Sequence, residues 1–206
     1  MEVAALFVAA GGVYFDPELA GIVDPWDEAR DARKYAGPHP VVAHPPCERW
    51  GRYWYGGPSV KVRKTKGDDG GCFASALASV RKYGGVLEHP EASAAWGAHG
   101  LMPPVTGGWH YDLVDGSWCC EVAQSAYGHR ARKLTWLYYV GDAPPPSLDW
   151  SRRSGVRLEE GFHSTAARAA ARAAGVRPVE RLGHRERAAT PIPFRDVLIE
   201  MARSVA

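Results

Sequence analysis

The sequence has few cysteines, no long hydrophobic run and little excess of either charge over its 206 residues. The four cysteines are Cys47, Cys72, Cys119 and Cys120. They lack the spacing of a zinc ribbon, and adjacent cysteines rarely bridge each other, so we expect reduced thiols and no resident metal. The apolar start of the chain carries Glu2 and reaches glycines too soon for a signal peptide or a membrane span, which favours a cytoplasmic protein.

The formal net charge of +2 excludes nucleic-acid binding through overall charge, so any such surface needs local clusters of Lys and Arg. With 46% apolar residues, a chain of this length can bury roughly 70% of its unfolded surface and should form one domain. Eight Trp and nine Tyr are many for this length, but aromatic residues serve cores, interfaces and base stacking alike.

Hydrophobic patterning predicts alternating strands and helices. Strands are expected at 3–8, 13–16, 40–46, 86–90 and 134–140, and helices at 24–37, 72–85, 164–175 and from Pro193 onward. This order predicts an α/β fold with a single, mostly parallel sheet flanked by helices and with active loops at the carboxyl ends of the strands.

The chain is expected to contain three regions. Residues 1–141 form the catalytic core, and within them 48–71 form a mobile loop rich in basic and aromatic residues. Residues 142–189 are a proline-rich connector followed by an Ala/Arg-rich helix. Residues 190–206 form a C-terminal helix that returns to the core.

The stretch "VVAHPPCERWGRYWYGG" (41–57) is the most informative in the chain. A strand that runs into two prolines holds Cys47 rigidly at the carboxyl edge of a sheet, where α/β enzymes place their chemistry. A lone free cysteine is often a small buried hydrophobe, so further motifs are needed to assign it a function.

Three further motifs follow in order. They are "VLEHP" (86–90), "YGHRARKLTWLYYV" (127–140) and "TPIPFRDVLIEMARSV" (190–205). Together with "HPPC" this series resembles the DNA cytosine C5-methyltransferase family. The resemblance implies a shortened Rossmann-like methyltransferase architecture in which Cys47 is the nucleophile, Glu88 recognises the base, and Arg130 and Arg132 are the motif arginines. Gly128 stands where the family has a glutamine, and Thr190 where it has an asparagine.

The chemistry explains why these residue types occur together. Addition of a thiolate at C6 of cytosine makes C5 able to attack an electrophile, which is the role implied for Cys47. A glutamate can protonate or hydrogen-bond N3 while it accepts from the exocyclic amine, as implied for Glu88. A cation near O2, Arg132 with Arg130 nearby, stabilises the charge that develops.

The family binds S-adenosylmethionine at a glycine-rich loop after the first strand and at an acid on the next strand. The matching residues here are Phe7, Gly11, Gly12, Asp24 and Trp26. Only about a dozen residues separate the glycines from Asp24, too few for a full crossover helix, so the cofactor loop is abbreviated.

DNA is the expected partner, either single-stranded or as a duplex with a flipped base. The candidate phosphate contacts are Arg49, Arg52, Lys61, Arg63, Lys64 and Lys66, and the aromatic residues expected to stack or fill the gap are Trp50, Tyr53 and Trp54. The short region 142–189 leaves no room for a full target-recognition domain. By analogy, an unselective modifier of this kind suits a bacteriophage or mobile element that marks its own DNA against restriction in a bacterial cell.

Three alternatives stay open at this point. The Cys47 adduct can take another one-carbon donor and give a hydroxymethyl product. The chain can be an inactive DNA-binding relative of the fold. It can also be a Cys/His metal protein that uses Cys72, His110, Cys119 and Cys120.

Overall fold

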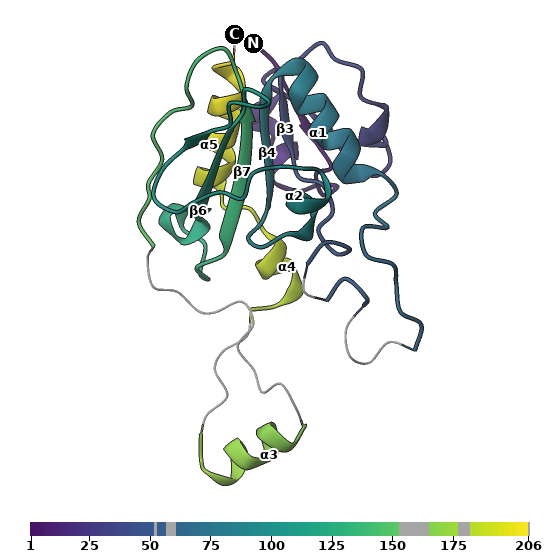
Figure 1. The fold of residues 1–206 in the computed structure, drawn as a ribbon, viewed down its shortest axis with the longest axis vertical. Coiled ribbons are helices and arrows are strands. Elements are labelled where there is room, and N and C mark those ends of the chain that lie inside the picture. The colour runs from purple at the N-terminus through teal and green to yellow at the C-terminus, as the bar shows by residue number, and fades with distance from the viewer. Residues whose placement is uncertain (52, 57–60, 153–164, 177–181, 206) are drawn as a thin grey trace.

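The computed structural model describes residues 1–51, 53–56, 61–152, 165–176 and 182–205, and within them a seven-stranded sheet has the order β2-β1-β3-β4-β7-β6-β5 (Figure 1). The strands are β1 (Val3–Leu6), β2 (Val23–Trp26), β3 (Val41–Ala43), β4 (Gly85–Pro90), β5 (His110–Tyr111), β6 (Trp118–Ala123) and β7 (Leu134–Val140). The α-helices are α1 (Cys72–Tyr83), α2 (Ala94–Ala98), α3 (Thr165–Ala173), α4 (His184–Ala188) and α5 (Ile192–Arg203). Single 3₁₀ turns are η1 (Val13–Phe15), η2 (Pro17–Leu19), η3 (Ala32–Lys34) and η4 (Gln124–Tyr127).

The sheet is mixed. Strands β2, β1, β3 and β4 are parallel to one another, whereas β7 is antiparallel to both β4 and β6, and β5 is antiparallel to β6. The expected α/β class is confirmed, but the expectation of a mostly parallel sheet is wrong, because only half of the strand pairings are parallel. The consecutive strands β6 and β7 pair directly, which short connections allow only in the antiparallel sense.

This topology brings several strand ends together. Because β7 is antiparallel to both β4 and β6, the strand β6 runs in the same direction as β4. The carboxyl ends of β1, β3, β4 and β6 therefore meet the start of β7 at one side of the sheet, which we call the carboxyl edge.

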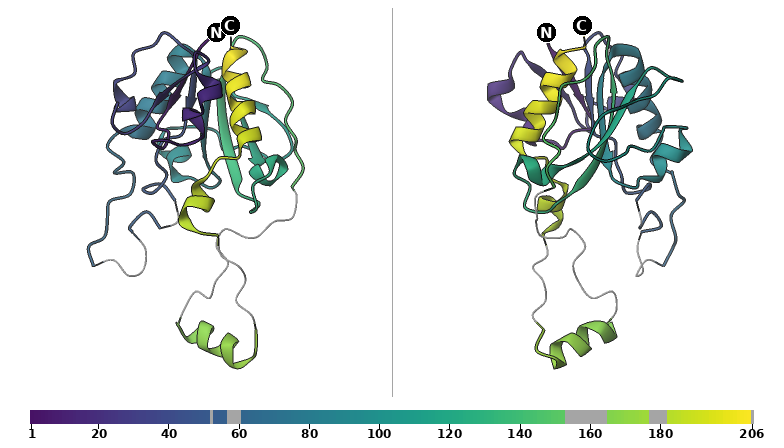
Figure 2. Two further views of the ribbon diagram at one scale, coloured as in Figure 1. Left: turned by 180° about the vertical axis from the view of Figure 1, so that it is seen from behind. Right: turned by 60° about the vertical axis from the view of Figure 1, so that its left-hand side comes forward.

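Helices cover both faces of the sheet (Figure 2). On one face α5 buries Phe194, Leu198 and Met201 against alternate strand residues such as Val42 and Val86. On the other, α1 buries Phe73, Leu77 and Val80 against the intervening residues such as Leu87. The alternation of side chains along each strand thus divides the core into two layers.

Two predicted elements are wrong. Residues 13–16 contain a 3₁₀ turn instead of a strand, and β2 overlaps the start of the segment predicted as helix 24–37, of which only η3 is helical. Pro25 suits the first turn of a helix. It is compatible with β2 because β2 lies at the end of the sheet, where a missing N–H breaks no second ladder.

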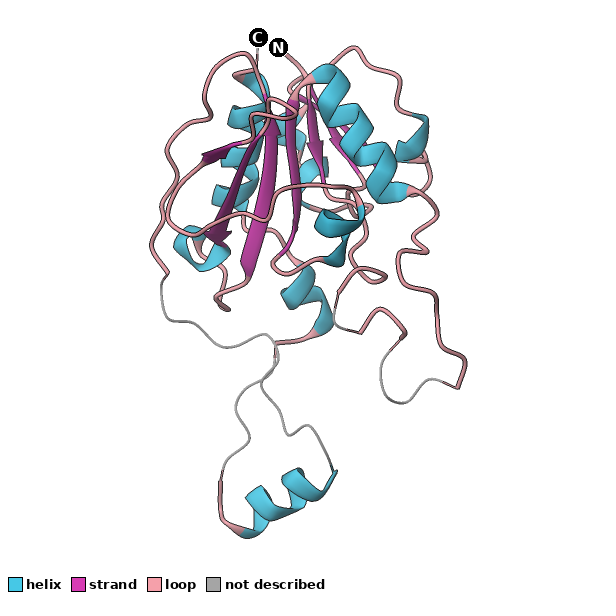
Figure 3. Cartoon of the chain, in the orientation of Figure 1, coloured by secondary structure: helices cyan, strands magenta, loops and turns pink. Residues whose placement is uncertain are grey.

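The loop between β3 and α1 contains neither helix nor strand in its described part (Figure 3). Helix α3 lies apart from the sheet in the same view. Across the described residues, no helix combines the length and apolar character needed to cross a bilayer.

Candidate active site

Glu88 projects from β4 at the carboxyl edge, on the face of the sheet that α5 covers. Side chains alternate along β4, so the Glu88 side chain lies on the same face of the sheet as Val86 and on the opposite face from Leu87. His44 directly follows β3, the neighbouring strand, and its backbone N–H continues the ladder by donating to Leu6 O at 3.0 Å. Adjacent strand ends therefore place these two side chains together.

Hydrogen bonds engage both carboxylate oxygens of Glu88. His44 Nδ1 lies 3.0 Å from Oε2, and Gln124 Nε2 donates to Oε1 at 3.0 Å. Gln124 Nε2 also donates to Thr135 Oγ1 at 2.9 Å. On the far side of the imidazole, Tyr14 Oη lies 2.7 Å from His44 Nε2. Residues from five separate segments thus form one continuous network.

The network keeps Glu88 ionised. Burial opposes ionisation, but the hydrogen bond and charge of His44, together with Lys133 and His89, outweigh it and hold the pKa of Glu88 at about 2. An ionised carboxylate only accepts hydrogen bonds, so His44 carries its proton on Nδ1.

Cys47 is exposed three residues beyond His44, at the start of a turn in which its carbonyl accepts from the N–H groups of Trp50 and Gly51. The surrounding protein atoms, and then the negative charge of Glu88, raise the pKa of the thiol above its ordinary value. The free protein therefore holds Cys47 as a thiol at neutral pH, and a bound substrate has to favour the thiolate.

Lys133 is the cation that acts on this pair. Burial lowers the pKa of its ammonium, and the charges of Glu88 and Cys47 oppose that shift. Its Nζ donates to Ala189 O at 2.8 Å and to Ala188 O at 3.3 Å, which ties the end of α4 to the site.

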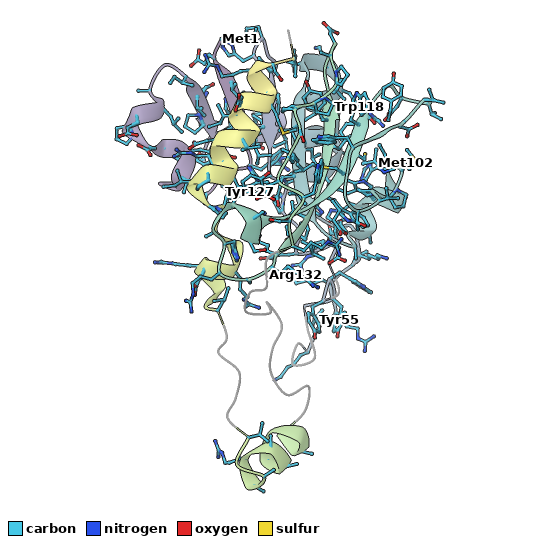
Figure 4. The ribbon with its side chains drawn as sticks, turned by 90° about the vertical axis from the view of Figure 1, so that its left-hand side faces the viewer. Met1, Tyr55, Met102, Trp118, Tyr127 and Arg132 are labelled. Atoms are coloured by element: carbon cyan, nitrogen blue, oxygen red, sulfur yellow. The ribbon has the colours of Figure 1, made fainter. Side chains whose placement is uncertain are left out.

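The structure places the two motif arginines elsewhere. Arg130 forms an ion pair with Glu186 at 2.6 Å. Arg132 is exposed at the lower edge of the sheet (Figure 4), and its charge acts on Glu91. Lys133 has a positive φ of 30°, so the backbone turns immediately after Arg132 and gives the site-facing position to the lysine.

The residues matched to the cofactor site lie at the ends of β1 and β2. Phe7 follows β1 with a φ of 60°, and Trp26, the last residue of β2, pairs in register with Leu6. Gly11 has open space where a side chain would stand, whereas a Cβ on Gly12 would meet Ala9 O at 2.9 Å.

Asp24 and Trp26 are engaged by Arg30. Asp24 accepts from Trp26 Nε1 at 2.7 Å and forms an ion pair with Arg30, whose guanidinium carbon lies 4.0 Å from the Trp26 ring centroid. A ribose would need the carboxylate and an adenine would need the ring face. In this arrangement the residues do not fit S-adenosylmethionine.

The loop after Cys47 is held at its base. Gly67 N donates to Arg49 O at 3.0 Å, and Trp50 Nε1 donates to Asp69 at 2.8 Å. Trp50 is buried in the core on the α1 face, so its prediction as a stacking residue is wrong. Arg49 donates to Trp54 O at 3.3 Å, within the loop.

The outer part of the loop is basic and aromatic. Tyr55, labelled in Figure 4, packs edge-on against Trp54 with ring centroids 5.6 Å apart, and Arg63 lies over the Tyr55 ring at 5.5 Å. The exposed cations of the described part are Lys61, Arg63, Lys64 and Lys66. Arg52 lies outside the described residues.

The cysteines of the metal alternative do not converge. Cys119 and Cys120 are consecutive in β6 and lie in opposite core layers, as adjacent strand residues must. In the part of the chain that the structure describes, no three His, Cys, Asp or Glu side chains are placed to hold a metal ion.

Four network residues were not predicted: Tyr14, His44, Gln124 and Thr135. Lys133, whose charge acts on Glu88 and Cys47, was not predicted either. A signal existed only for His44, which stands inside "HPPC". Comparison with models of known protein families and a search of curated proteins gave no match, so the family resemblance rests on the motifs alone.

Proposed function

We propose that this protein modifies cytosine at C5 in DNA through a covalent adduct with Cys47. One observation carries the proposal: the thiol of Cys47 and the buried carboxylate of Glu88 follow adjacent strands to the same edge of the sheet and interact electrostatically. A nucleophile beside a carboxylate that can read N3 and the exocyclic amine is what addition at C6 requires.

In this proposal the carboxylate of Glu88 accepts from the exocyclic amine, and Cys47 attacks C6. The new C6–S bond uses the thiolate electron pair, and the displaced C5–C6 π electrons make C5 nucleophilic, as in an enamine. C5 then attacks the electrophile. Loss of the C5 proton to water and expulsion of the thiolate then restore the aromatic ring. The ammonium group of Lys133 favours the thiolate form of Cys47 and stabilises the negative charge that develops on the cytosine ring.

The family resemblance implies a shortened Rossmann-like methyltransferase architecture and, as the first candidate reaction, methyl transfer from S-adenosylmethionine. The engagement of Asp24 and Trp26 by Arg30 favours a second candidate, in which a different one-carbon donor supplies C5. The mass of the product distinguishes the two.

The test is mass spectrometry of nucleosides from the DNA of cells that express the wild type, Cys47→Ala or Cys72→Ala. Cys72 is a second free cysteine, at the start of α1, and serves as the matched control. We expect a modified cytosine with the wild type and Cys72→Ala and none with Cys47→Ala, and its added mass identifies the donor class.

Unaltered cytosine with all three proteins would contradict the proposal. DNA binding without a product would then favour an inactive DNA-binding relative, and a product that persists in Cys47→Ala would exclude the covalent route.

A further inference from the structure

His44 connects Glu88 to Tyr14, and neither His44 nor Tyr14 has a part in the chemistry derived above. Its ring has one nitrogen 3.0 Å from the carboxylate and the other 2.7 Å from the phenol oxygen. The Tyr14 and His44 ring centroids are 5.3 Å apart, so the two rings also pack against each other. The imidazole is therefore held at both of its ring nitrogens.

A carboxylate alone is poorly suited to N3 of cytosine, because N3 is itself an acceptor. Glu88 can donate to N3 only after it gains a proton. Both of its oxygens already accept hydrogen bonds, from His44 and from Gln124. Gln124 is an amide and its N–H is not acidic, so among these bonded partners only the imidazole can hand over a proton.

We propose that His44 is the proton donor to Glu88, and that the two side chains share one proton which Glu88 passes to N3 of the bound cytosine. The inference rests on the proposed function and deepens it, since it assigns the source of the N3 proton. As the base enters and displaces water, a neutral acid beside a neutral imidazole becomes favoured over an ion pair.

The step balances without another reactant. The Nδ1–H bond of the imidazolium breaks and an Oε2–H bond forms on Glu88, then Oε2–H breaks as N3–H forms. When the thiolate leaves, the N3 proton returns by the same route.

Tyr14 allows both states of His44. A phenol both donates and accepts, so its oxygen accepts from Nε2–H of the imidazolium and of the neutral ring that has passed its Nδ1 proton to Glu88. It donates to Nε2 when a neutral ring carries its proton on Nδ1 beside ionised Glu88. Burial and the charge of Glu88 raise the pKa of Tyr14 well above its ordinary value, so it stays a phenol. Tyr14 is thus a positioning residue and not the proton source.

Other charged groups bear on the pair. Toward Glu88 these are Lys133 before β7 and His89 in β4 itself, and toward Tyr14 they are Arg195 and Asp196 of α5. Cys47 also interacts with Glu88. Burial lowers the pKa of His89 to about 4, although the charge of Glu88 acts in the opposite direction. His89 is therefore neutral at the pH at which His44 and Glu88 would share a proton.

The first experiment measures exchange of the C5 hydrogen of cytosine in DNA with solvent, which needs the Cys47 adduct but no donor. The wild-type rate is expected to fall at alkaline pH as the pair loses its shared proton. His44→Asn should lower the rate about 100-fold or more at neutral pH and remove this alkaline limb. Tyr14→Phe should cost about tenfold, as expected from the loss of one hydrogen bond.

The matched control is His110→Asn, which changes an exposed histidine of β5 and should leave rate and profile unchanged. Wild-type rate and an intact alkaline limb in His44→Asn would overturn the proposal.

A second measurement does not depend on turnover. In protein labelled with ¹⁵N-histidine, the nitrogen shifts of His44 should show a proton on Nδ1 in both the neutral and the charged ring. In the free protein, where Glu88 is ionised, a neutral ring with the proton on Nε2 would overturn the shared proton. If the shifts agree but the wild type exchanges no C5 hydrogen, the proposed function fails instead.

Discussion

His89 lies beside Glu88 in β4, yet its side chain enters the opposite core layer. It is fully buried, in contact with the rings of Phe73 and Trp96 at centroid distances of 5.2 and 6.2 Å. Burial disfavours the imidazolium and lowers the pKa of His89 to about 4. At neutral pH this residue is an uncharged part of the core.

This lowered pKa predicts a loss of stability in mild acid. The unfolded chain binds a proton on His89 near pH 6.5 and the folded chain only near pH 4, so the contribution is complete above pH 6.5 and disappears as the pH falls to about 4. The difference corresponds to roughly 3 kcal/mol. His89→Asn should flatten this dependence, measured as urea unfolding at pH 7 and pH 4.5, whereas His110→Asn should not.

Glu88 contributes to the pH dependence of stability over a lower pH range than His89. Because its pKa is lowered from 4.5 to about 2, its contribution is present above pH 4.5 and is lost as the pH falls through about 2. If the His89→Asn protein still lost as much free energy of unfolding between pH 7 and pH 4.5 as the wild type, that loss would come from a residue other than His89 and Glu88.

The sequence indicated Cys47 and Glu88 as candidates because Cys47 directly follows the apolar stretch 40–46 and Glu88 lies in the apolar stretch 86–90. Tyr14, Gln124 and Lys133 come from three other segments, and only the strand order joins them, so no local pattern identified them. Lys133 was not identified because spacing along a chain does not reveal its positive φ, which turns the backbone.

Helix α1 depends on a residue that precedes it. Asp69 accepts from Gly71 N and Phe73 N, both at 2.9 Å, and from Trp50 Nε1 at 2.8 Å. One carboxylate thus pairs with two N–H groups at the start of the helix, those of Gly71 and Phe73, and holds the base of the basic loop.

Asp69→Ala should therefore lower the free energy of unfolding by about 1–2 kcal/mol through loss of the cap, with a further cost from the unpaired Trp50 indole. Chemical denaturation measures the change. The control is Asp68→Ala, an exposed neighbour expected to change stability by less than about 0.5 kcal/mol. Equal effects of the two substitutions would contradict the capping role.

The longer elements were predictable and the short ones were not. Helices α1 and α5 were expected from amphipathic patterns that their buried faces satisfy. The strand β2 has four residues and contains Pro25, so its local preference conflicts with its structure. Its place in the sheet comes from pairing with β1, which is information that lies outside the segment.

On the scale of the whole molecule, the carboxyl edge gathers both the candidate chemistry and the basic loop. The loop begins directly after Cys47, its two ends are joined by the Gly67–Arg49 hydrogen bond, and its outer cations are exposed. In the proposed function this places positive charge next to the point where a flipped base would enter. A phosphate backbone would then contact the loop while the base reaches Glu88.

This arrangement predicts that the loop cations contribute to DNA affinity in a salt-dependent way. The double variant Lys64→Ala/Lys66→Ala should weaken binding to any DNA sequence and reduce the slope of log affinity against log salt by about 2, because each lost phosphate contact removes about 0.9. The matched control removes two charges elsewhere, with Lys34→Ala in η3 and Lys82→Ala near the end of α1. Fluorescence anisotropy across a salt series measures both. Equal losses in the two double variants would show that only net charge matters, and an unchanged loop variant would exclude this face as the DNA surface.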